Sequence, residues 1–104
     1  HNIMFDIKTI TQRFFKYGIH ALEFSSLTPY HPRVFDTMKA FTLGDRQDYV
    51  SLDTVSKFLG IEQTKTMKGS DVYKQYQDGN LQQIVEYCKG DVELVRKVYN
   101  KLTI

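Results

Sequence analysis

Two short patterns place a carboxylate one helical turn from a second polar side chain. The first pairs Tyr87 with Asp91, a four-residue spacing that brings two side chains to the same face of a helix. A carboxylate can bind a divalent cation, and a tyrosine hydroxyl one turn away could orient a water bound to that cation. The alternative is that Tyr87 packs in the core and Asp91 caps the following helix, and this pattern alone leaves both interpretations open.

The second pattern is Asn2-Ile3-Met4-Phe5-Asp6, at the start of an expected helix. Asn2 and Asp6 share a face if both are helical. A carboxylate near a helix N-terminus is also favoured by the helix dipole, which would account for Asp6 without any function.

Taken together, the two patterns resemble motifs of one enzyme family. The segment from Asn2 to Asp6 resembles the second acidic motif of the DEDD superfamily of 3′–5′ exonucleases, and Tyr-x-x-x-Asp at Tyr87 and Asp91 resembles the third motif of its tyrosine subtype. The segments 31–38 and 65–72, followed by Tyr76, Gly79 and Ile84, look like predicted exonucleases related to the proofreading domain of family B DNA polymerases. The resemblance extends over essentially the whole chain.

This resemblance implies an RNase H-like α/β fold and a two-metal phosphodiesterase acting on the 3′ end of nucleic acid, with single-stranded DNA as the expected substrate. In such a site two Mg²⁺ or Mn²⁺ ions are held by four carboxylates. Carried onto this sequence, Asp6 and Asp91 are the expected metal ligands and Tyr87 the residue that positions the attacking water. Asn2 and Phe5 are expected beside the substrate strand.

The first acidic motif of the family, Asp-x-Glu on a strand, is expected upstream of Asn2. The literal Asp-x-Glu at Asp91 and Glu93 does not replace it, because side chains two apart diverge on a helix. We therefore expect a C-terminal portion of an exonuclease domain, spanning residues 1–104, that is inactive alone. Apolar faces left without their usual cover would make self-association of the chain plausible.

Composition narrows the function classes. A formal net charge of +2 does not support a purely electrostatic nucleic-acid binder. A single cysteine, Cys88, excludes an intrachain disulfide, and no apolar run is long enough to span a membrane. No signal peptide is visible, so a cytoplasmic location without membrane partners is expected.

Periodicity predicts mostly helices. Apolar residues three and four apart predict a helix over 3–17 that ends near Gly18. A second is expected from Ser51 to Leu59, closed by Gly60, and a short one after Ser70 as its N-cap. Helical patterns also cover 81–88 and 91–102, where the intervening Gly90 lowers the expectation of one unbroken helix.

The remaining segments are expected to be irregular or extended. Residues 19–32 predict a connection with a short strand at its start, and 61–69 an exposed loop. The β-prone run 34–38 predicts a strand with Asp36 near its end. The expected fold class is therefore α/β, truncated to a mostly helical C-terminal portion with one or two short strands.

Weaker candidates have stronger structural explanations. A buried structural role is favoured for Cys88, and surface or turn roles are favoured for His1, His20 and His31, which lack metal-ligand spacing. Lys65 and Lys68 could contact a DNA backbone. Three aromatic residues, Phe14, Phe15 and Tyr17, could stack on bases, although core packing of at least two of them is favoured. Two other function classes stay open: a non-catalytic helical interaction module derived from the exonuclease fold, and a generic helical DNA-binding domain.

Overall fold

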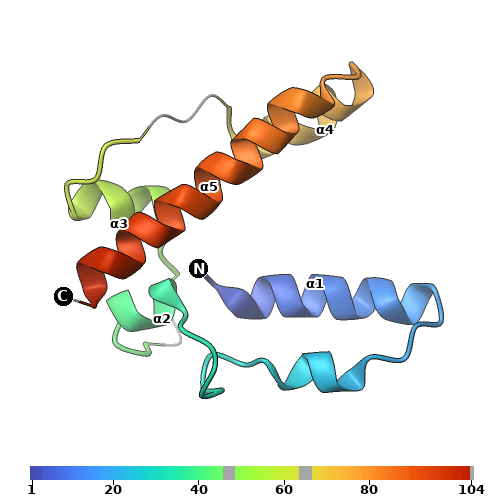
Figure 1. The fold of residues 1–104 in the computed structure, drawn as a ribbon, viewed down its shortest axis with the longest axis horizontal. Coiled ribbons are helices and arrows are strands. Elements are labelled where there is room, and N and C mark those ends of the chain that lie inside the picture. Colours follow the sequence, from blue (N-terminus) through green and yellow to red (C-terminus); the bar gives the residue numbers. More distant parts are fainter. Residues whose placement is uncertain (46–48, 64–66, 104) are drawn as a thin grey trace. The chain divides into compact units, whose positions relative to one another are not determined.

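The computed structural model describes residues 1–45, 49–63 and 67–103, and these residues form helices joined by loops (Figure 1). No strand occurs among them. The chain divides into an N-terminal unit, His1–Ser51, and a C-terminal unit, Leu52–Ile104. The elements are, in chain order, α1 (Ile3–Lys16), η1 (Leu22–Ser26), α2 (Thr37–Phe41), α3 (Leu52–Phe58), η2 (Gly69–Asp71), α4 (Val72–Gln77) and α5 (Leu81–Leu102), where η denotes a 3₁₀ helix.

Helix α1 is the main element of the N-terminal unit, and its amphipathic pattern decides which face is covered. Ile7 is buried, while η1 packs along the helix through an edge-on contact between the rings of Phe14 and Phe24, whose centroids lie 5.7 Å apart. The helix ends as predicted before Gly18, which adopts φ +67°. This part of the sequence prediction is confirmed.

The short helix α2 begins where a strand was predicted. Asp36 is its N-cap, and the Asp36 carboxylate accepts hydrogen bonds from the backbone N–H groups of Met38 and Lys39. Thr37 and Met38 are buried, which accounts for the apolar, β-prone composition of the segment. The prediction of a strand over 34–38 is therefore wrong, because a side-chain cap turns the backbone into a helix.

The core of the C-terminal unit lies between α3 and α5. Val55 of α3 and Val98 of α5 are fully buried, and Leu94, one turn before Val98, is 5% exposed. Each fully buried side chain of this size contributes about 1.5–3 kcal/mol to folding. This apolar seam therefore fixes which face of α5 is turned toward α3.

Helix α5 is one continuous helix through Gly90, and not two helices separated there. A Cβ atom added to Gly90 would have nothing within 4 Å outside the backbone of its own helix, so no close approach requires a glycine there. Its cost of about 1 kcal/mol relative to alanine is small beside the burial of Leu94 and Val98. Tertiary packing therefore overrides the local preference.

Two further boundaries differ from the sequence prediction. The start of the connection 19–32 forms the 3₁₀ helix η1, where a short strand was expected. Ser70 is not an N-cap but lies within η2, and Asp71 closes that turn by accepting a hydrogen bond at Oδ2 from the Lys68 N–H at 3.0 Å. The expected helix over 51–59 is confirmed as α3. None of the helices described here is long and apolar enough to cross a membrane.

Candidate active site

Tyr87 and Asp91 belong to the same stripe of α5 as the buried residues Leu94 and Val98. The four positions follow one another at intervals of four, three and four residues, which keeps them on one face of the helix. Tyr87 and Asp91 are half-buried, whereas Leu94 and Val98 are buried against α3. A tyrosine and a carboxylate thus continue a stripe that is apolar further along the helix.

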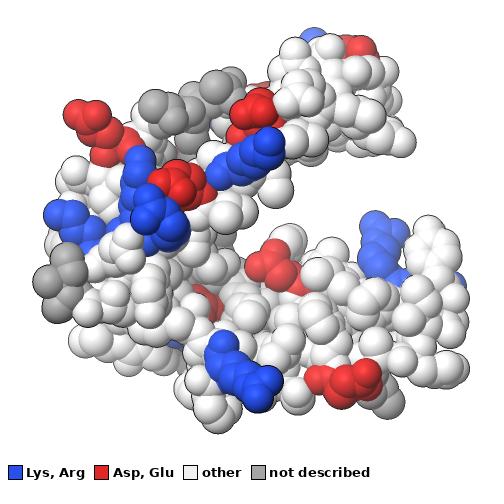
Figure 2. Space-filling model, viewed as in Figure 1, with Lys and Arg blue, Asp and Glu red and all other residues white. Residues whose placement is uncertain are grey.

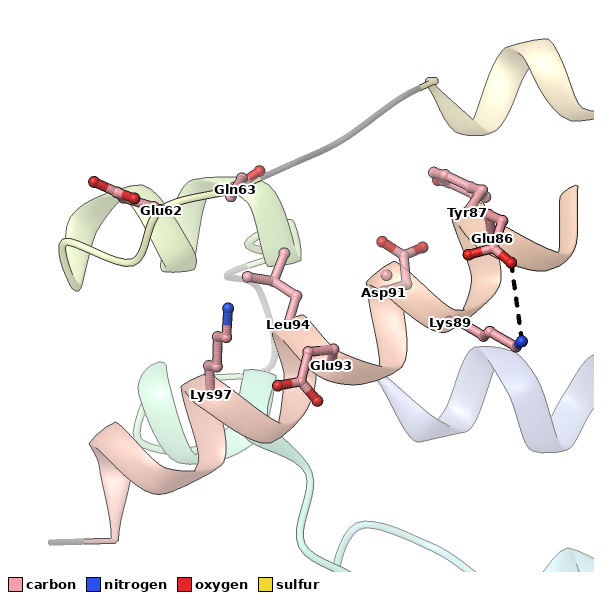
Figure 3. A pocket seen from close by; sticks show the side chains of 10 residues that line it. Glu62, Gln63, Glu86, Tyr87, Lys89, Asp91, Glu93, Leu94 and Lys97 are labelled. Carbon is pink, nitrogen blue, oxygen red and sulfur yellow. Dashed lines mark ion pairs between the residues drawn. The ribbon is translucent and has the colours of Figure 1, made fainter. Parts of the chain in front are cut away.

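Tyr87, Asp91 and Leu94 line a cleft of about 410 Å³ in the C-terminal unit (Figure 3). One wall is α5, from Glu86 to Lys97, and the other is the segment after α3, with Glu62 and Gln63. Gln63 is held in place because its Nε2 donates a hydrogen bond to the Asp53 carbonyl oxygen at 3.1 Å. The cleft is therefore bordered by α5 and by a segment whose Gln63 side chain is hydrogen-bonded to the backbone of α3.

The charges along α5 are mixed. Lys89 and Glu86 form an ion pair of 3.9 Å at the edge of the cleft, and Arg96 pairs with Glu93. On the face shown in Figure 2, positive and negative side chains are interspersed over the region of this helix. The surface near Tyr87 and Asp91 is accordingly not the uniform basic field that purely electrostatic binding of nucleic acid would need.

The environment of Tyr87 keeps its phenol protonated. Burial raises the pKa of Tyr87, and the Asp91 carboxylate raises this pKa further, through its negative charge and by hydrogen bonding with the phenol. The charge of Asp71 acts in the same direction. At neutral pH, Tyr87 is therefore a hydroxyl group that can donate a hydrogen bond, and not a phenolate base.

Glycine at position 69 borders the Tyr87 hydroxyl. A Cβ atom built on Gly69 would lie 3.6 Å from the Tyr87 Oη, which is ordinary van der Waals contact. The η2 turn, which directly precedes α4, thus lies close to the Tyr87 hydroxyl within the C-terminal unit. Gly69 belongs to the segment 65–72 that carries the family resemblance, but no pattern in the sequence predicts its place beside Tyr87.

The second sequence motif lies in the N-terminal unit, at the start of α1. Asn2 is the N-cap, Phe5 is 66% exposed, and Asp6 is exposed in the first helical turn. The structure brings Asn2, Phe5 and Asp6 together on this turn, and it brings Tyr87 and Asp91 together on α5. Asn2 lies just outside the helix with left-handed backbone angles of φ 58° and ψ 56°, so the condition under which Asn2 and Asp6 would share a helical face is not met.

Asp36 is the residue that sequence analysis placed in the wrong context. Its buried carboxylate accepts hydrogen bonds from the N–H groups of Asn2 and Ile3, at 2.9 and 2.8 Å, besides capping α2. Burial alone would raise the pKa of Asp36, but the hydrogen bonds from Ile3, Asn2 and Lys39 outweigh it and lower the pKa below the ordinary value. The only signal in the sequence was an acidic residue preceding Thr37 in a β-prone run.

His1 also contacts this region and has a structural environment. Its Nδ1 lies 2.8 Å from the Thr37 hydroxyl oxygen, and its Nε2 lies 2.7 Å from the Val50 carbonyl oxygen. The imidazole thereby connects the start of α1 to the start of α2 and to the segment before α3. The expectation that His1 has a surface or turn role is therefore wrong. Its imidazole is part-buried and links these three segments.

The described residues do not assemble a complete two-metal site. Oxygen donors such as the Asp91 carboxylate suit Mg²⁺ or Mn²⁺. Within the described residues, however, no group of three or more His, Cys, Asp or Glu side chains is arranged to hold a metal ion. These residues alone therefore do not form a complete two-metal centre.

The weaker candidates are placed as follows. Lys65 lies outside the described residues, and Lys68 is exposed. Cys88 is exposed, contrary to the expected burial, because it lies on the outer side of α5. Phe14 is half-buried, but Phe15 and Tyr17 are 61% and 68% exposed, so the expectation that two of these three pack in the core is wrong.

Comparison with known proteins identifies the family. A family profile described as a predicted 3′–5′ exonuclease related to the exonuclease domain of PolB matches residues 1–103. The chain belongs to this family, as the motifs around Asp6 and Asp91 indicated. Searches of the curated proteins and of the solved structures returned no match.

Proposed function

We propose that these residues form part of a 3′–5′ exonuclease domain that hydrolyses phosphodiester bonds of single-stranded DNA with Mg²⁺ or Mn²⁺. The observation that carries the proposal is the Tyr87–Asp91 pair. These two residues lie on the same stripe of α5 as the buried residues, and their side chains line the cleft. Membership of a predicted exonuclease family supports it over residues 1–103. The RNase H-like fold of the complete domain is part of the same proposal.

The proposed roles follow from the chemistry of the side chains. Asp6 and Asp91 provide two of the carboxylates that hold the metal ions, and further carboxylates come from outside these residues. The bound ions would supply charge stabilisation of the phosphodiester during hydrolysis. Tyr87 stays protonated, so its hydroxyl orients water by hydrogen bonding and does not act as a base. Asn2 and Phe5 contact the substrate strand, for which the 66% exposure of Phe5 is suitable.

A gel assay tests the proposal in the complete domain. A DNA oligonucleotide labelled at its 5′ end is incubated with Mg²⁺ or Mn²⁺, beside a second oligonucleotide whose 3′ end is blocked and a matching RNA. We expect a ladder of products shortened from the 3′ end, which chelation of the metal abolishes. The blocked oligonucleotide should stay intact, and the 104-residue chain alone should be inactive.

Variants assign the residues. Asp91→Ala and Asp6→Ala should abolish activity, and Tyr87→Phe should lower kcat roughly 10²-fold, because the water loses its orientation. Asp78→Ala is the matched control, since Asp78 is an exposed carboxylate at the turn before α5. A complete domain that neither binds Mn²⁺ nor shortens any oligonucleotide would overturn the enzyme assignment in favour of a non-catalytic interaction module.

A further inference from the structure

Asp36 connects the starts of two helices through one buried carboxylate. Its Oδ1 accepts hydrogen bonds from the N–H groups of Asn2 and Met38, each at 2.9 Å, and from Lys39 at 3.3 Å. Its Oδ2 accepts one from the Ile3 N–H at 2.8 Å. With 5% of its surface exposed, Asp36 is the buried acidic residue of the described part of the chain.

This arrangement changes the usual role of an asparagine at a helix start. An N-cap asparagine normally has extended backbone angles and caps the helix with its own side chain. Asn2 instead has left-handed angles, and its side chain makes no capping hydrogen bond. The Asp36 carboxylate binds the N–H groups of Asn2 and Ile3 from a distance of more than thirty residues along the chain. The helix therefore does not need the Asn2 amide.

A left-handed backbone costs free energy for residues other than glycine, and although asparagine tolerates it better than most, its surroundings decide whether it persists. Here the surroundings are the Asp36 carboxylate and the His1 imidazole, which lies 2.8 Å from the Thr37 hydroxyl oxygen. Strained backbone of this kind is concentrated at functional sites. Asn2 is also the first residue of the motif that ends at Asp6.

We propose that Asp36 is a positioning residue for the Asn2–Asp6 motif, because it holds Asn2 in the left-handed conformation and leaves the Asn2 amide to contact the substrate strand. By binding the Ile3 N–H it also fixes the first turn of α1, on which Asp6 lies. Asp36 has no direct contact with substrate or metal in this role. The expected effect of Asp36 on catalysis rests on the exonuclease function proposed above. The claim that Asp36 holds the backbone of Asn2 rests on the hydrogen bonds alone.

Asp36→Ser separates positioning from simple helix capping. Serine caps helices about as well as aspartate, so the hydroxyl introduced by this substitution would still cap α2. A single short hydroxyl cannot also reach Asn2 and Ile3 on the other helix. The matched control is Thr42→Val, which removes the hydrogen bond from the Thr42 hydroxyl to the Met38 carbonyl oxygen, at the opposite end of α2.

The geometric test uses the 104-residue chain and NMR. The Cα and Cβ chemical shifts of Asn2 distinguish left-handed from extended or right-handed backbone. We expect Asn2 to leave the left-handed conformation in Asp36→Ser and to keep it in Thr42→Val. If Asn2 stays left-handed in Asp36→Ser, the clamp does not determine its conformation and the inference is wrong.

The enzymatic test uses the complete domain. Asp36→Ser should lower kcat about tenfold or more while KM changes less than about threefold, because a misplaced motif weakens transition-state contacts more than ground-state binding. Thr42→Val should leave both constants near the wild type. An unchanged kcat in Asp36→Ser would overturn the positioning role. If the wild-type domain shows no metal-dependent activity, the proposed function fails, and the NMR test still decides whether Asp36 holds Asn2.

Discussion

Two valines on the same helix provide a direct test of the register of α5. Val98 is fully buried and Val92 is 66% exposed. Replacing either by alanine removes the same atoms and raises helix propensity by the same amount, up to about 0.7 kcal/mol. The difference between the two variants therefore isolates the effect of burial. This register is important because it also turns Tyr87 and Asp91 toward the cleft.

The expected magnitude follows from the burial of Val98. Loss of two buried methylene equivalents, at about 0.8 kcal/mol each, destabilises the protein by about 1.6 kcal/mol. A cavity of about 40 Å³ that does not collapse would add about 1 kcal/mol. Val98→Ala should therefore be less stable than Val92→Ala by about 1.6–2.6 kcal/mol, and Val92→Ala should be as stable as the wild type or more stable by up to about 0.7 kcal/mol.

Urea denaturation followed by far-UV circular dichroism gives the free energies of unfolding. Native-state hydrogen exchange at the amides of α5 shows whether the loss is located in the C-terminal unit. Equal destabilisation by Val98→Ala and Val92→Ala would refute the register. In that case Tyr87 and Asp91 would not lie on the core-facing stripe, and the candidate site would lose its structural basis.

Three further outcomes are expected. The pKa of Asp36 is lowered in the folded chain, so the ionised carboxylate stabilises the fold above the ordinary aspartate pKa of about 3.9. This stabilisation is lost as the pH falls through the pKa that Asp36 has in the folded chain. The free energy of unfolding, measured against pH, should therefore fall more steeply below about pH 4 in the wild type than in Asp36→Asn. Asp91→Asn should lower the pKa of Tyr87 toward its ordinary value, since one of the charges that raise it is removed, and an unchanged Cζ titration by NMR would contradict this. Gly90→Ala should stabilise the chain by about 0.5–1 kcal/mol in thermal unfolding, because Gly90 lies inside α5 with open space around it. Gly79→Ala, its counterpart at a turn, should destabilise it by about 1–2 kcal/mol, because Gly79 has φ +76°.

The long helices could be predicted from the sequence because their apolar residues recur every three or four positions. That pattern gave the end of α1 before Gly18 and the helical character of the segments 81–88 and 91–102, which form α5. It also placed Tyr87 and Asp91 on one face. What periodicity could not show was that α5 passes through Gly90 without a break, since this depends on packing against α3.

The short segment around Asp36 could not be predicted for a different reason. Val34, Thr37 and Met38 have β-prone or apolar side chains, and local preference alone favours a strand there. The observed helix depends on hydrogen bonds between residues more than thirty positions apart, which no local pattern contains. The left-handed conformation of Asn2 could not be predicted for the same reason. Asn2 occupies the N-cap position of α1, but the Asp36 carboxylate, and not the Asn2 side chain, accepts the hydrogen bonds there.

The Asn2–Asp6 motif and the Tyr87–Asp91 pair are thus positioned by different kinds of interaction. Tyr87 and Asp91 depend on apolar packing of α5, which is insensitive to acid but sensitive to loss of volume at Val98. The Asn2–Asp6 motif depends on a charged hydrogen-bond acceptor, Asp36, which weakens as it becomes protonated. Acid should therefore disturb the start of α1 before it disturbs α5, and hydrogen exchange measured at falling pH should show loss of protection at Ile3 earlier than at Val98. If both amides lose protection together, the two regions unfold as one cooperative structure, and Asp36 then acts on the whole chain and not on the first turn of α1 alone.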